Sequence, residues 1–78
     1  MPRPVTKLRP GETGIITTIL QTVPERLVKL SSLGVMPGAE ITLVQRNPAV
    51  ILKISETSIA LDGEVADAIL VESTEERS

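Results

Sequence analysis

The chain has 78 residues, a net charge of −2, and no His, Cys, Phe, Tyr or Trp. This composition excludes disulfides, thiolate chemistry, histidine ligands and aromatic platforms for nucleobases or polyproline segments. The eight basic residues are scattered along an acidic chain, so we expect no nucleic-acid binding.

A single domain is expected at this length, with a small core. We place the folded core at about residues 5–72 and treat residues 1–4 and 73–78 as flexible ends of a domain spanning 1–78. The N-terminal segment is polar and contains no apolar run, as expected for a protein without a secretory signal. The longest apolar run, Ala49 to Leu52, is too short to span a bilayer. We therefore expect a cytoplasmic protein without direct membrane insertion.

The first regular elements are a strand and a helix. The strand is predicted over Gly14–Leu20, which is rich in β-branched residues. Thr22 and Glu25 match a capping box, and Pro24 suits the first turn of the helix that follows. Three apolar side chains share one face of this helix: Val23, Leu27 and Leu30.

The stretch after this helix predicts a helix stop followed by a turn. With Leu33 as the last half-helical residue, Gly34 occupies the position that favours a left-handed conformation. Val35 and Leu30 form the apolar pair that accompanies a Schellman-type stop. In Met36–Ala39, Pro37 and Gly38 then fit the two central positions of a type II turn. An anion-binding glycine loop is disfavoured, because these glycines follow a helix C-terminus, where the dipole repels anions.

The rest of the chain predicts short strands separated by turns. The expected elements are strands over Glu40–Arg46, Ala49–Ile54, Ser58–Leu61 and Ile69–Val71, with one helical turn over Glu64–Ala68 capped by Asp62. The fold class is therefore mainly β with short helices. About five strands curl into a small, partly closed barrel, with one helix after the first strand and a single helical turn before the last.

The segment Leu27–Ile41 resembles the signature of the FeoA family, in which a short helix ends in Leu-Gly before an apolar residue, Pro-Gly and a strand. The residues that carry the resemblance are Leu30, Leu33, Gly34, Val35, Pro37, Gly38 and Ile41. The later hairpin and the closing segment also resemble those of the family, so that the likeness covers roughly residues 5 to 72. In the tight turn where the family often has glycine, this chain has Ser55-Glu56-Thr57.

The resemblance implies an SH3-like barrel and a role as a small cytosolic accessory protein of bacterial ferrous iron uptake. Such proteins act by contact with FeoB, the membrane ferrous iron transporter, and the family is associated with transition metal ions. The alternative is a metal-responsive regulatory domain, because the same domain type occurs at the C-terminus of iron-dependent transcriptional repressors.

Four residues are candidates for contact with a protein partner. Arg26 and Lys29 offer charge on the helix, while Met36 and Ile51 offer apolar contact. Each has a structural alternative: charged residues normally cover a solvated helix face, and β-branched residues in strands normally pack. Self-association through an apolar strand face is a secondary prediction.

Neither a metal site nor a catalytic site is predicted. Asp62, Glu64 and Asp67 cluster at one corner, but ferrous iron sites usually include imidazole or thiolate ligands, so we expect no tight ferrous iron site. Glu64 and Asp67 have the spacing of a general acid–base pair, yet no nucleophile or cofactor loop accompanies them. We therefore predict a non-enzymatic protein without a cofactor.

Overall fold

The computed structural model describes residues 1–74, which form a mainly β fold with short helices. The six strands of this part of the chain form one antiparallel sheet in the order β1-β6-β2-β3-β4-β5. They are β1 (Arg3–Pro4), β2 (Thr13–Ile19), β3 (Glu40–Gln45), β4 (Val50–Ile54), β5 (Thr57–Leu61) and β6 (Ile69–Ser73). The helices are the 3₁₀ helix η1 (Val5–Lys7), α1 (Pro24–Ser32) and α2 (Gly63–Asp67).

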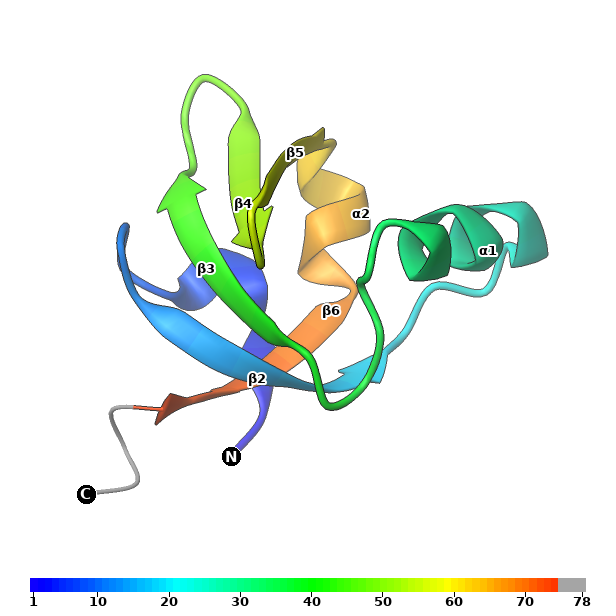
Figure 1. The fold of residues 1–78 in the computed structure, drawn as a ribbon, viewed down its shortest axis with the longest axis horizontal. Coiled ribbons are helices and arrows are strands. Elements are labelled where there is room, and N and C mark those ends of the chain that lie inside the picture. The colour runs from blue at the N-terminus through cyan, green and yellow to red at the C-terminus, as the bar shows by residue number, and fades with distance from the viewer. Residues whose placement is uncertain (75–78) are drawn as a thin grey trace.

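The sheet curls on itself, as Figure 1 shows. The pairing register shifts between Ile16 and Thr18 in β2 and between Leu43 and Gln45 in β3. Such irregularities bend a strand and increase its twist. Because β1 and β5 lie at opposite ends of the strand order, the barrel is only partly closed. The predicted fold class is confirmed, with six strands in place of about five.

The additional strand comes from the N-terminal segment. Residues 1–4 and 73–78 were expected outside the folded core, but Arg3 pairs with Val71, and Pro4 with Leu70. Pro4 is compatible with β1 because β1 is an edge strand, the place in a sheet where proline is usually found. Ser73 likewise belongs to β6, while residues 75–78 of the expected flexible end lie outside the described residues.

The core lies inside the curled sheet. Strands β4 and β6 alternate between buried and outward-facing residues, which is the pattern of strands with one face on a core. Val5 and Leu8 of the N-terminal segment are fully buried, and α2 contributes the buried Ala66. Helix α2 packs on η1 and β6, so the N-terminal segment and α2 together cover one side of the core.

The helix stop and the turn expected between α1 and β3 are both present. Gly34 has φ +93°, its N–H donates to the Ser31 carbonyl at 2.9 Å, and the Val35 N–H donates to the Leu30 carbonyl at 2.9 Å. These are the two hydrogen bonds of a Schellman motif. Gly38 has φ +95° in the turn that follows. Across that turn the Ala39 N–H donates to the Met36 carbonyl at 3.1 Å, as in a type II turn.

Of the two predicted helix caps, the capping box at Thr22 is wrong and the cap position at Asp62 is confirmed. The N-cap of α1 is Val23 rather than Thr22, and its N–H donates to Oε1 of Gln21 at 3.2 Å. Asp62 does occupy the N-cap position of α2, but its side chain makes no capping hydrogen bond. In α1, Pro24 takes the first helical position and needs no partner for an N–H it lacks.

Candidate partner-binding surface

Helix α1 lies to one side of the barrel, at the right of Figure 1. Of its nine residues, Leu30 alone is buried. The half-buried Leu33 at the C-cap packs against the same core. The helix is therefore anchored through its last turn, and its first turns stay open to solvent.

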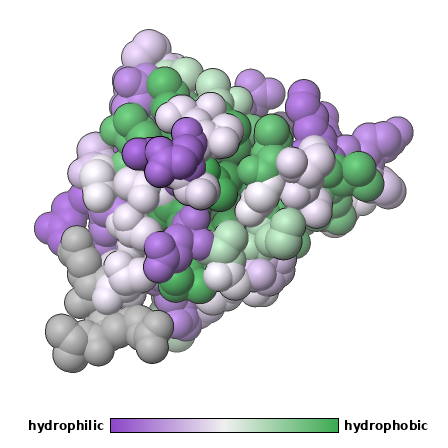
Figure 2. Space-filling view, in the orientation of Figure 1, coloured by the Kyte–Doolittle hydropathy of each residue, from purple (hydrophilic) through white to green (hydrophobic). Residues whose placement is uncertain are grey.

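The exposed part of α1 is apolar on one face. Val28 is 69% exposed, Leu27 37% and Met36, in the turn after the helix, 43%. These three residues, which we call the α1 apolar face, line one shallow depression of about 610 Å³ together with Ile19 and Pro37. Figure 2 shows hydrophobic residues reaching the surface on this side of the molecule, between hydrophilic ones. Because these apolar side chains are neighbours on one surface, they are a candidate interaction site.

This exposure differs from the sequence expectation for the helix. Val23, Leu27 and Leu30 were expected to share the buried face, but Val23 and Leu27 are each 37% exposed. The periodicity is correct, yet the barrel reaches only the end of the helix near Leu30. Val28 lies off that periodic face and was not predicted as a contact residue.

A second depression, the α1–β5 groove, lies between α1, the strand β5 and the start of α2. Its volume is about 320 Å³. One wall carries the basic residues Arg26 and Lys29 of α1, and the other carries the acidic residues Asp62 and Glu64. The apolar residues that line it are Leu30, Leu33, Ala60, Leu61 and Val65. The groove can therefore take a ligand that has an apolar middle and presents opposite charges to the two walls.

The four predicted contact residues do not form one site. Arg26 and Lys29 line the α1–β5 groove, and Met36 lies on the α1 apolar face. Ile51 is half-buried on β4, paired with Gln45 and Ala60, and lines neither depression. Three of the four residues thus lie on or next to α1, while Ile51 belongs to a different surface.

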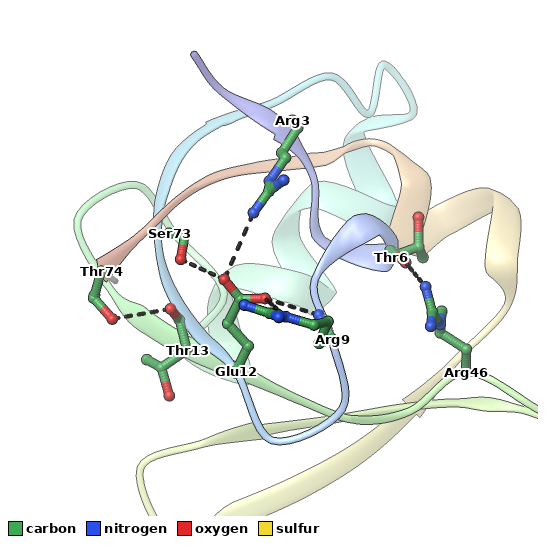
Figure 3. A network of polar contacts seen from close by, with 8 residues as sticks. All are labelled: Arg3, Thr6, Arg9, Glu12, Thr13, Arg46, Ser73 and Thr74. Carbon is green, nitrogen blue, oxygen red and sulfur yellow. Dashed lines mark hydrogen bonds and ion pairs between the residues drawn. The ribbon is translucent and has the colours of Figure 1, made fainter. Parts of the chain in front are cut away.

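Among residues 1–74, the most buried charged side chain lies in the turn before β2 and not on α1. Glu12 is only 5% exposed and lies at the centre of the contacts in Figure 3. Its Oε1 accepts the Arg9 backbone N–H at 2.8 Å, and its Oε2 accepts a short hydrogen bond from the Ser73 hydroxyl. The Arg3 Nη2 lies 3.6 Å from Oε2. This carboxylate therefore ties β1 and the turn before β2 to the end of β6.

Hydrogen bonding decides the ionisation of Glu12. The backbone hydrogen bond from Arg9 lowers the pKa of this carboxyl most, followed by the hydrogen bond from Ser73. Burial acts in the opposite direction, while the positive charges of Arg9 and Arg3 add to the lowering. The result is an ionised carboxylate with its partners in place, which identifies a structural group. No sequence pattern indicated this group, because Arg3 and Ser73 lie in the two segments that were expected to be flexible.

The acidic corner near α2 does not assemble into a metal site. In residues 1–74 the structure brings together no group of three or more His, Cys, Asp and Glu side chains that could hold a metal ion. Oδ1 of Asp67 instead accepts the Thr6 hydroxyl at 2.5 Å. Hydroxyl and carboxylate oxygens are also poor ligands for ferrous iron compared with imidazole or thiolate. No helix in the described part of the chain is long and apolar enough to cross a membrane.

The comparison with protein families decides the assignment of this scaffold. Residues 3–73 match the model of the FeoA domain. The chain belongs to the FeoA family. The match begins at β1 and ends with β6, so that it includes the N-terminal strand, which was not predicted from the sequence.

Individual relatives agree with the FeoA assignment. A protein from Leptolyngbya boryana named Fe(2+) transport protein A is 31% identical over 65 residues, which are 82% of this chain and 79% of that protein. The crystal structure of an iron uptake regulatory protein, FeoA, superimposes with a TM-score of 0.81 at 29% identity, covering 94% of this chain and 97% of the other. A manganese-dependent transcriptional repressor shares the fold, with a TM-score of 0.81 at 24% identity over 92% of this chain and 41% of its own.

Proposed function

We propose that this chain is a cytoplasmic accessory protein of ferrous iron uptake that acts by contact with the FeoB membrane transporter. Support comes from its FeoA family membership and from a relative named for Fe(2+) transport. Its action is binding rather than catalysis. The transported iron is the cargo of the partner, so the role requires no tight iron site in this chain.

The observation that carries this proposal is the α1 apolar face. A domain of 78 residues has little apolar surface to spare, yet it leaves Leu27, Val28 and Met36 open around an outlying helix. Burial of apolar area contributes about 25 cal/mol per Å², so a partner that covers these side chains gains affinity. Two polar residues, Ser31 and Ser32, line the same depression. They are suited to the solvent-accessible polar rim that surrounds the apolar centre of an interface.

A pull-down from membranes that contain FeoB tests the proposal. The tagged chain should retain the transporter, and Val28→Glu should lose it, because the substitution places a charge in the apolar contact. Val44→Glu is the matched control, since Val44 is 43% exposed on β3 and lines neither depression. Equal retention by both variants would rule out the α1 apolar face as the contact.

The same pull-down distinguishes the transport role from the alternative, regulatory role. The second candidate function is regulatory, because a transcriptional repressor contains a domain of the same fold. Retention of a repressor or of DNA, without the transporter, would favour it over transport. Calorimetry with ferrous iron under anaerobic conditions is the companion measurement, because tight one-to-one binding would contradict the donor set described above.

A further inference from the structure

Strand β5 is an exposed sheet edge. It pairs with β4 on one side, and no other strand among residues 1–74 pairs with it. Helix α2 follows β5 directly, and its main contacts are with η1 and β6 rather than with β5. An uncovered edge presents backbone N–H and C=O groups that can pair with another strand.

The register shows which groups of β5 are open. Ser55 and Glu56 form a two-residue turn, and the hairpin closes on the pair Ile54 and Thr57. Hydrogen-bonded and non-hydrogen-bonded pairs alternate along an antiparallel ladder. With Ile54 and Thr57 as a hydrogen-bonded pair, the N–H and C=O of Ser58 and Ala60 point away from β4. Both residues are exposed, and Ala60 lines the α1–β5 groove, so this end of the strand edge lies beside the groove.

The charges of this groove have no partners across it. Within residues 1–74, no ion pair joins Arg26 or Lys29 on the α1 wall to the acidic wall. Asp62 also makes no capping hydrogen bond with its side chain. The two walls therefore offer opposite charges to a ligand, with apolar side chains between them.

We propose that the α1–β5 groove binds an extended segment of a partner protein, which adds to β5 as a further strand. The segment carries an acidic side chain for Arg26 and Lys29 and a basic one for the Asp62 and Glu64 wall. Backbone pairing at a strand edge beside a helix is a known mode of peptide recognition, with side chains providing specificity.

The size of the groove favours a single segment over a second copy of this chain. Its volume of about 320 Å³ is at the lower end of the range for ligand pockets, about 300–1,000 Å³. A second copy would bring its own α1 and barrel towards β5, where α1 already forms the opposite wall. The inference does not depend on the transporter as partner, because the proposed transporter contact lies on the α1 apolar face.

Two fluorescein-labelled, capped eight-residue peptides of alternating Val and Thr test the proposal by fluorescence anisotropy with the full chain. One peptide has Glu near its N-terminus and Lys near its C-terminus, and the other has the reverse order, which tests the strand direction. One order should bind more tightly. Methylation of alternate peptide nitrogens in that peptide should weaken binding about tenfold or more, because it removes the donors that pair with β5.

Substitutions at Ala60 provide the matched variants. Ala60→Pro removes the outward N–H without removing a β4–β5 ladder bond, and it should weaken peptide binding, while Ala60→Ser keeps the N–H and should not. Val28→Glu should leave peptide binding unchanged, which separates this groove from the transporter contact. Circular dichroism and thermal unfolding check that each variant folds.

Three results would overturn the inference. The first is no binding of either peptide at about 1 mM, the weakest affinity expected for a specific site. The second is that the methylated peptide binds as tightly as the unmethylated one. This comparison uses the unmodified protein, so it remains informative even if Ala60→Pro does not fold. The third is self-association that Ala60→Pro abolishes, because a second copy would then occupy the edge.

Discussion

The Glu12 region and helix α1 depart from ordinary burial in opposite directions. At Glu12 a charged side chain is buried and surrounded by hydrogen-bond donors. At α1 apolar side chains are exposed, and the residues described give them no cover. The first arrangement closes the two ends of the folded chain on each other, whereas the second leaves surface free for another molecule.

The difference separates structural residues from candidate binding residues. A buried carboxylate with its partners in place stabilises one arrangement of the chain, and removing it leaves those partners unpaired. An exposed apolar side chain contributes little to folding and can gain free energy when a partner covers it. Substitutions in the two regions should therefore affect stability and binding in opposite proportions.

The largest effect is expected where α1 is anchored. Leu30→Ala should lower the free energy of unfolding by about 3 kcal/mol, because it leaves a cavity at a side chain that is 3% exposed. Leu27→Ala, one turn earlier and 37% exposed, should cost less than about 1 kcal/mol. Urea unfolding of both variants provides the measurement. Similar losses would show that the whole helix is packed, and would remove the contrast between the two regions.

Glu12→Gln should have the next largest effect. The neutral amide cannot replace the charged acceptor of the Arg9 N–H and Ser73 hydroxyl, and we expect a loss of about 2 kcal/mol in urea unfolding. Glu72→Gln is the control, because it makes the same change at an exposed position of β6. If both variants unfold at the same urea concentration, the buried network does not hold the chain ends together.

A backbone prediction concerns the turn beside the α1 apolar face. Gly38→Val should cost about 1–3 kcal/mol, because Gly38 has φ +95°, where a β-branched residue is strained. Gly63→Val should cost less, since Gly63 has no positive φ. Neither added Cβ would meet an atom within 4 Å, so conformation alone separates the two variants. Equal midpoints in a denaturant melt would contradict the type II turn.

The pH dependence of stability should carry the signature of Glu12. Its folded pKa lies below the reference value of 4.5, so the unfolded chain binds more protons at this site as pH falls. The stabilisation is therefore complete above the unfolded value and is lost as pH falls through the lowered folded value. Urea unfolding at a series of pH values should show that Glu12→Gln loses less stability on acidification than the unmodified chain. Parallel pH profiles would contradict this assignment.

The sequence predicted local structure better than burial. Gly34 and Gly38 predicted the helix stop and the turn correctly, because the positive φ at each position favours glycine. Strand β1 was missed because Arg3–Pro4 is too short for a periodic pattern and depends on pairing with β6. The exposure of Leu27 and the charged walls of the groove were missed for a similar reason: they depend on where α1 lies relative to the barrel, which no local pattern contains.

The smallest effect on stability is expected at Val28, the most exposed residue of the α1 apolar face. Val28→Glu should change the free energy of unfolding by no more than about 0.5 kcal/mol, because the side chain is 69% exposed and Glu is a good helix former. Urea unfolding measures this change on the same sample used for the transporter pull-down. Together with lost retention of the transporter, a neutral melt would assign Val28 to binding. A loss above about 1 kcal/mol would show instead that the α1 apolar face stabilises the fold, because exposed positions rarely cost so much.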